Sequence, residues 1–181
     1  MADTAHSKRF GNGNFRELGP VNWAITKIGA KKQGRRTLGV FATLGRSGHV
    51  FRSWLIYGAA HMPFGPLGRR DTELVICRVA FLRDSAYELD HHRGLAAKAG
   101  LSEKTIAAVL SAEHGQQGRQ AALLDATDEL VKTQSLTDAT YNALLAVCTP
   151  KEITALVMLV THYDGLATTL DVLGTPVDKR R

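Results

Sequence analysis

The stretch that decides the fold is ELVICRVAFLRDSAYELDHHRGLAAKAGL, residues 73 to 101. Its apolar spacing predicts two helices, over 71–83 and 85–99, joined by a short turn. Charged side chains are seldom buried on a helix unless they are paired or take part in chemistry. Because two acids and two imidazoles share this one apolar region, the stretch indicates a site for proton transfer.

The spacing within the second helix places several of these side chains together. Ser85, Glu88 and His92 stand at i, i+3 and i+7 and therefore share one stripe of a helix. Glu88 and His92 are four residues apart, which allows a hydrogen bond between them. Glu73 belongs to the preceding helix, and a turn between the helices would bring its carboxylate close to the stripe. The site residues predicted to do chemistry are therefore His92, Glu88 and Glu73.

Three short motifs along this region carry a resemblance. An Arg-x-x-Glu-Leu-Val-Ile-x-Arg-Val-Ala pattern covers 70–80, Tyr-Glu-Leu-x-x-His covers 87–92, and Ala-Gly-Leu-Ser covers 99–102. Together they resemble the carboxymuconolactone decarboxylase family, which shares its fold with the alkyl hydroperoxidase D (AhpD) proteins. The resemblance implies an all-α fold, an AhpD-like helical bundle, over roughly 48–174.

The AhpD proteins carry a Glu followed by Cys-x-x-Cys-x-x-x-His, and this chain departs from that pattern. The two family cysteines fall on Ser85 and Glu88, and the family histidine falls on His92. A dithiol peroxidase needs a thiolate of low pKa and a second, resolving thiol. Cys77 and Cys148 both lie in apolar runs and are interpreted as buried packing residues. We therefore expect no thiol-based cycle.

The preferred function is a cofactor-free lyase of the decarboxylase type, acting on a small carboxylated or lactone-like molecule. Loss of CO2 leaves an enolate that needs a proton, which His92 can supply while Glu88 orients its ring. Glu73, if buried, would have a raised pKa and could be a second proton carrier. Two alternatives remain: a peroxidase (peroxiredoxin-type oxidoreductase) of the alkyl hydroperoxidase branch, and a non-catalytic oligomer that binds a small molecule.

A further set of residues is predicted to contact the substrate, four because they belong to the same two helices and His162 because it stands on the apolar face of the last helix. They are Arg78, Tyr87, Ser85, His91 and His162. Each also has a purely structural interpretation. Arg78 could tie helices together by a buried ion pair instead of binding a substrate carboxylate, and Tyr87 could serve only in packing.

A metal site is the rival chemistry. Glu88-x-x-His91 matches one Glu-x-x-His element of the di-iron helical bundles, which need two such elements and two further glutamates. Only one is found, and the adjacent His91 and His92 would point about 100° apart on a helix. We therefore expect neither a metal nor another cofactor.

Length and composition predict one helical domain preceded by an arm. The chain has 181 residues, of which 44% are hydrophobic, and this suffices for a single core. We expect a basic, partly irregular arm over 1–36, with a short helix at 21–29, and a domain over 37–181. No run of 18 apolar residues and no secretory signal are recognised, so we expect no membrane partner and a cytoplasmic location.

The net charge of +6 lies entirely within 1–36, because the rest of the chain balances. No nucleic-acid motif accompanies this charge, so we expect no nucleic-acid partner. The arm is either loose or clasps a neighbouring subunit through Phe10, Phe15 and Leu18. The family resemblance implies a homo-oligomer, a dimer, trimer or hexamer.

Overall fold

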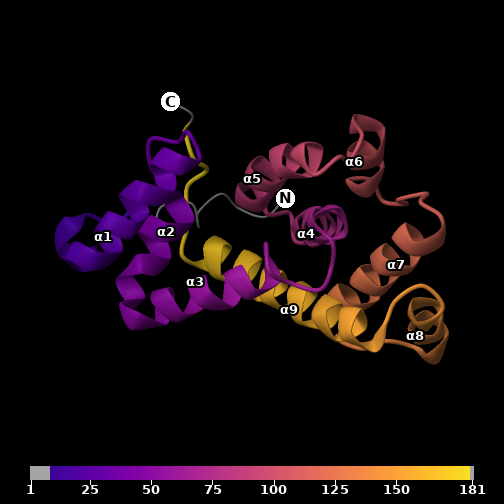
Figure 1. Cartoon of the computed structure of the whole chain (residues 1–181). Coiled ribbons are helices and arrows are strands. Elements are labelled where there is room, and N and C mark those ends of the chain that lie inside the picture. The colour runs from indigo at the N-terminus through magenta and orange to yellow at the C-terminus, as the bar shows by residue number, and fades with distance from the viewer. Residues whose placement is uncertain (1–8, 180–181) are drawn as a thin grey trace. The chain divides into compact units, whose positions relative to one another are not determined.

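The structure is a computed structural model that describes residues 9–179, and all its regular elements are helical (Figure 1). This confirms the all-α prediction. The elements follow in chain order: α1 (Phe15–Lys32), α2 (Gly39–Leu44), the short 3-10 helix η2 (Gly45–Ser47), α3 (His49–His61), α4 (Arg69–Leu82), α5 (Ala86–Lys98), α6 (Glu103–Val109), α7 (Gly118–Thr133), α8 (Asp138–Leu145) and α9 (Pro150–Val172).

The contacts divide the chain into two compact units, which are described separately. Of the described residues, one unit contains 9–58 and 168–179, and the other is Ala59–Ala167. The predicted division into 1–36 and 37–181 stays a prediction.

In the first unit, α1 corrects the expectation for residues 10–36. Asn14 caps this helix by accepting hydrogen bonds from the backbone N–H groups of Arg16 and Glu17, at 2.9 and 3.2 Å. The Glu17 carboxylate accepts the Asn14 N–H in return, at 2.8 Å, which completes a capping box. The helix expected at 21–29 is longer than predicted, because α1 begins at Phe15, is kinked at Gly19 with φ of 70°, and continues to Lys32.

The segment before α1 also contacts the first unit. The Arg46 guanidinium donates to the carbonyl oxygens of Phe10 and Gly11, at 3.2 and 3.1 Å, and Leu18 is buried. Residues 10–19 are therefore held by the unit, whereas the sequence predicted that they lie outside the core. Residues 1–8 of the predicted leader lie outside the described range.

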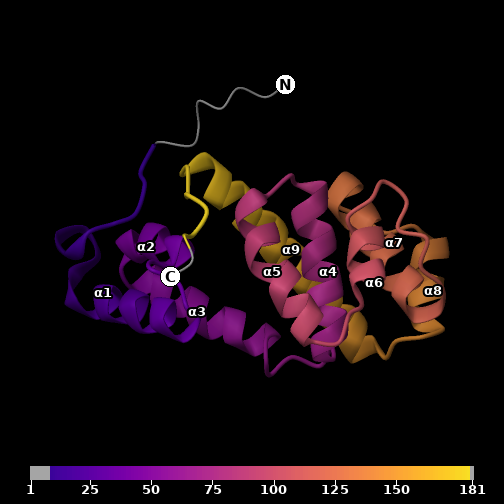
Figure 2. The same ribbon diagram turned by 90° about the horizontal axis from the view of Figure 1, so that it is seen from above.

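The second unit is built around α4, which packs against α5, α6 and α7. Its residues from Thr72 to Ala80 are all buried, which explains why the sequence is apolar almost all round this helix. Seven side chains form the core cluster beside it: Leu74, Cys77, Ala96, Leu101, Ile106, Val109 and Leu124. Figure 2 shows α5 lying alongside α4.

A tight turn reverses the chain between α4 and α5. Asp84 adopts a left-handed backbone conformation with φ of 49°, and the Ser85 N–H donates to the carbonyl of Ala80 at 2.9 Å. At the other end of α5, Gly100 has φ of 90°, which glycine accepts without strain. The predicted turn and the predicted stop at Gly100 are both confirmed.

Helix α9 is long and apolar enough to cross a membrane by length and composition alone. Only one helix of the described residues passes this test, and 44% of its most apolar window is buried by the protein itself. A core helix of a soluble protein passes the same test, so α9 is weak evidence for a membrane span.

Candidate functional site

The structure brings Glu73, Glu88 and His92 together in the second unit. Nδ1 of His92 lies 2.8 Å from Oε2 of Glu73, and its Nε2 lies 3.3 Å from Oε2 of Glu88. All three side chains are buried, and Glu73 has no exposed surface. Each ring nitrogen of His92 is therefore matched with a carboxylate, in the arrangement that the spacing of α5 and the turn before it predicted.

The two carboxylates control the charge of His92. Burial alone would lower the pKa of this imidazole, but the hydrogen bonds and charges of Glu73 and Glu88 outweigh burial and raise its pKa to about 9. His92 is therefore an imidazolium at neutral pH, and the site holds a proton ready for donation.

Arg69 completes the charge pattern, and the sequence interpretation missed it. Its Nη2 lies 2.6 Å from Oε1 of Glu73, the oxygen that His92 does not use. The charges along the cluster then alternate from Arg69 through Glu73 and His92 to Glu88. The signal was present, because Arg69 stands four residues before Glu73 and such pairs face each other on a helix.

Aromatic rings cover another side of the cluster. The Tyr163 ring on α9 makes edge-on contacts with His92 at 5.3 Å and with His162 at 5.2 Å between ring centroids. His162 in turn stacks on His61 at 5.6 Å. The predicted substrate-contacting residue His162 thus lies in the same cluster as His92, one ring further out.

The pKa values of His162 and His92 are shifted in opposite directions. Burial, followed by the neighbouring His61, lowers the pKa of His162 to about 4, while Glu88 acts in the other direction. Burial also lowers the pKa of His61. The neutral His162 and the imidazolium of His92 therefore coexist within the cluster at neutral pH, and such opposite shifts are a frequent feature of acid–base sites.

Three other predicted residues belong to the first two turns of α5 or to its N-cap. Tyr87 is buried and stacks on the half-buried His91, with ring centroids 5.0 Å apart. Ser85 occupies the N-cap position of α5, but its side chain makes no capping hydrogen bond. Their roles toward a substrate stay predictions.

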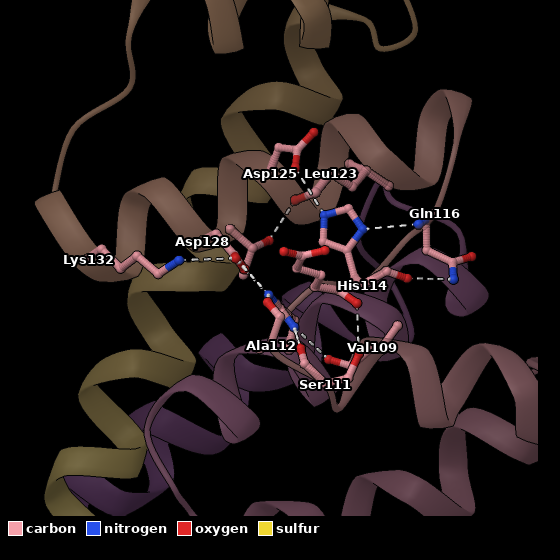
Figure 3. A network of polar contacts seen from close by, with 12 residues as sticks. Val109, Ser111, Ala112, His114, Gln116, Leu123, Asp125, Asp128 and Lys132 are labelled. Carbon is pink, nitrogen blue, oxygen red and sulfur yellow. Dashed lines mark hydrogen bonds and ion pairs between the residues drawn. The ribbon is translucent and has the colours of Figure 1, made fainter.

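Arg78 is placed elsewhere, on the side of α4 that faces α6 and α7. Its buried guanidinium donates to Asp128 at 2.6 Å and to the carbonyl oxygens of Val109, Ser111 and Ala112 at 2.9, 2.6 and 3.3 Å. Figure 3 shows these three residues gathered near Asp128. With its donors engaged in this way, Arg78 fits the structural interpretation, and the expectation that it contacts a substrate is not supported by these contacts.

The surroundings of the two cysteines differ: Arg119 donates to Sγ of Cys148 at 3.2 Å, whereas Cys77 belongs to the apolar core cluster. Cys77 and Cys148 are buried free thiols. Burial, and then the charge of Glu73, raises the pKa of Cys77 to about 12. Burial also raises the pKa of Cys148. Neither thiol has the low pKa that a peroxidatic cysteine requires.

The residues from 9 to 179 contain no group of three or more His, Cys, Asp or Glu side chains arranged to hold a metal ion. In the Glu73–His92–Glu88 cluster, the carboxylates already occupy both nitrogens of the imidazole.

The family comparison covers the region of the chain that contains this site. The model of the carboxymuconolactone decarboxylase family matches residues 48–129, a range that includes Glu73, Glu88 and His92. The predicted resemblance is therefore confirmed: residues 48–129 match the model of this family. A comparison with curated proteins finds no matching sequence.

Solved structures confirm the AhpD-like fold. An AhpD-core protein from Ralstonia eutropha JMP134, described as uncharacterized and peroxidase-related, is 17% identical with a TM-score of 0.80, over 93% of this chain and 91% of that one. A peroxidase-related protein from Silicibacter sp. TM1040 is 11% identical with a TM-score of 0.77, over 90% and 86%. A protein of unknown function from Agrobacterium tumefaciens is 18% identical with a TM-score of 0.63, over 71% and 90%. These identities establish the fold alone.

Proposed function

We propose that this chain is a carboxymuconolactone decarboxylase-like enzyme that performs acid–base chemistry, without a cofactor, on a small carboxylated or lactone-like molecule. The observation that supports this most is the buried His92 held between two carboxylates. A buried charged imidazole is expensive to maintain unless it is paired or functional. Here it is paired on both sides and still carries a transferable proton.

In the decarboxylation that we propose, the bond between the substrate's carboxylate and its α-carbon breaks and CO2 leaves. The electron pair stays on the carbon as an enolate, and His92 donates the proton that forms the new C–H bond. We assign the donation to Nε2, because its contact with Glu88 is longer than the contact of Nδ1 with Glu73. Glu73 keeps the ring oriented, and the neutral Nε2 then accepts the next proton.

The second candidate is a peroxidase of the alkyl hydroperoxidase branch. Two of the structurally similar proteins are described as peroxidase-related, which keeps this candidate open. Against it, Ser85 and Glu88 occupy the positions of the family cysteines, and Cys77 is a buried thiol with a pKa of about 12. A third candidate is a non-catalytic oligomer that binds a small molecule and retains only the fold.

We also propose a homo-oligomer in the cytoplasm. Several large apolar side chains of the first unit are more than half exposed, and a monomer seldom leaves so many uncovered. They are Phe10, Phe15, Val21, Ile28, Val50 and Ile56. Phe10 and Phe15 are two of the predicted clasp residues, so their exposure supports a contact with a second copy.

The deciding experiment compares turnover of a panel of lactones and β-keto acids by the intact protein and by His92→Gln. The exposed His49 provides the control variant His49→Gln. We expect turnover by the intact protein and the control, and its loss in His92→Gln. Thiol-dependent peroxide consumption that survives in His92→Gln would favour the peroxidase, and binding without any turnover would favour the non-catalytic protein.

A further inference from the structure

Arg69 is the part of the charged cluster that solvent can reach. It is the first residue of α4, one helical turn before Glu73. Its side chain is 41% exposed, whereas the Glu73 side chain has no exposed surface at all. A ligand that arrives from solvent therefore meets the Arg69 guanidinium before it meets either carboxylate.

The contact between Arg69 and Glu73 is short, but it is not a well-formed hydrogen bond. The two charged atoms lie 2.6 Å apart, yet Oε1 of Glu73 accepts no hydrogen bond of normal geometry from the described residues. A guanidinium carries five N–H donors in a planar fork. One carboxylate oxygen cannot satisfy that fork, so donors remain for another anion.

The other paired arginines of residues 59–167 are occupied more completely. Arg119 donates to Asp71, to Glu152 and to the carbonyl of Val147. Arg83 binds Asp164 and the carbonyl of Val131. Arg78 binds one carboxylate and three carbonyl oxygens. Among the ion-paired arginines of this unit, Arg69 alone combines an exposed guanidinium with a single contact to one carboxylate oxygen.

Arg69 also lies near the aromatic side of the cluster. Burial, followed by the charges of Glu88 and Glu73, raises the pKa of Tyr163, and the positive charge of Arg69 opposes this rise. The guanidinium is therefore close enough to Tyr163 for its charge to act on the phenol. Tyr163 in turn makes an edge-on contact with the His92 ring.

We infer that Arg69 is the anchor for a carboxylate group of the ligand, and that binding of this carboxylate strengthens the hold of His92 on its proton. The inference rests on the proposed function, because it concerns the same site. Arg69 fills the role that the sequence assigned to Arg78. A planar guanidinium suits a carboxylate because two parallel N–H···O bonds can form.

The coupling follows from the charges that face His92. From α4 these are Glu73 with Arg69 behind it, from α5 Glu88, and from α9 Tyr163 and the neutral His162, which stacks on His61 of α3. An anion at Arg69 adds negative charge and shares the cation that balances Glu73. The imidazolium is then stabilised, so the pKa of His92 rises further.

The test uses benzoate as the probe and the neutral benzamide as its isostere. The His92 ring is followed by NMR through pH titrations of the intact protein, with its signals assigned from His92→Gln. The variants are Arg69→Gln and Arg69→Lys. Arg70→Gln is the matched control, because the neighbouring Arg70 is exposed on the same turn of α4.

We expect benzoate, but not benzamide, to shift the His92 signals saturably and to raise the pKa of His92. The affinity should fall about 10- to 100-fold in Arg69→Gln, as expected for the loss of a charged hydrogen bond. Arg70→Gln should bind as the intact protein does. Arg69→Lys should bind more weakly than the intact protein, because a lysine cannot form the paired bonds.

Equal binding by Arg69→Gln, equal effects of benzamide, or no saturable shift in the intact protein would overturn the anchor. If Arg69→Gln does not fold, Arg69→Lys decides, and unchanged benzoate affinity in that variant also overturns it. Because benzoate binding is measured without turnover, the test distinguishes a failure of the proposed decarboxylase from a failure of the Arg69 anchor. Intact benzoate binding without turnover defeats only the proposed decarboxylase, and turnover of the panel with unchanged affinity in Arg69→Gln defeats only the anchor.

Discussion

Nδ1 of His92 lies 2.8 Å from Oε2 of Glu73, a carboxylate that stands 19 residues earlier in the chain. The α4–α5 hairpin makes this contact, and the turn at Asp84 sets its register. The contact fixes the ring orientation and leaves Nε2 to face Glu88. The same hairpin therefore builds the core of the second unit and positions its acid–base group.

The first prediction concerns stability at alkaline pH. The pKa of His92 is about 9 in the folded protein against an ordinary value of 6.5. The stabilisation is therefore fully present below pH 6.5 and is lost as the pH rises through about 9. It amounts to ~3 kcal/mol at most. Urea unfolding at pH 6 and pH 9.5 should show this loss of unfolding free energy in the intact protein and a much smaller loss in His92→Gln. An equal loss in the two proteins would contradict the prediction.

His162 should show the opposite dependence. Its pKa is lowered to about 4, so its contribution is present above pH 6.5 and is lost as the pH falls toward 4. A His162→Asn variant should therefore lose less stability than the intact protein between pH 6.5 and pH 4, and the exposed His49→Asn should behave like the intact protein. If the free energy of unfolding of the intact protein does not change between pH 6.5 and pH 4, the prediction is wrong.

The second prediction concerns the pair of α5. We expect His92→Ala and Glu88→Ala each to reduce turnover by about 100-fold or more, the usual contribution of general acid–base catalysis. The double variant should be little worse than either single one, because the two side chains act as a unit. If the loss of kcat/KM in the double variant equals the product of the losses in the two single variants, Glu88 and His92 act separately.

The third prediction concerns the thiols. Cys77→Ala combined with Cys148→Ala should leave turnover within about twofold, and each change should lower the free energy of unfolding only by ~1 kcal/mol, through packing. Cys77, with a pKa of about 12, should react with a thiol reagent only on unfolding. Rapid loss of either thiol with peroxide, in step with turnover, would restore the peroxidase candidate.

The fourth prediction concerns the start of α1. Asn14→Ala should lower the free energy of unfolding by ~1 kcal/mol, because two backbone N–H groups lose their acceptor. The exposed Asn12 offers the control Asn12→Ala, which should change the unfolding midpoint very little. If both variants unfold alike in urea, the capping box does not stabilise this helix.

The sequence predicted the second unit well because its signals are local. Helix spacing, the turn before Ser85 and the glycine at 100 together define α4 and α5, and an i, i+4 relation brought Glu88 to His92. Glu73 could be placed as well, because a tight turn leaves two consecutive helices few ways to pack.

The contacts of Arg78 could not be predicted from the sequence for the opposite reason. Its acceptors lie on Asp128, on the last residue of α6 and on the chain just after α6, and no sequence pattern near Arg78 indicates them. Arg69 was missed although its spacing was visible, because exposure decides its role and a sequence does not show exposure. The N-terminal helix was underestimated because its signal was a capping box at Asn14 and not an apolar stripe.

The last prediction tests the structural role of Arg78. Removal of its charge in Arg78→Met should destabilise the protein by ~3–5 kcal/mol, because Asp128 and three carbonyl oxygens lose their buried partner. Lys132 binds the same Asp128 at 3.3 Å but is 60% exposed, so Lys132→Met is the matched control and should cost less than ~1 kcal/mol. Urea unfolding measures both. The affinity of Arg78→Lys for benzoate, where that variant folds, should equal that of the intact protein. If Arg78→Met is stable but no longer binds benzoate, Arg78 and not Arg69 is the residue that binds the carboxylate.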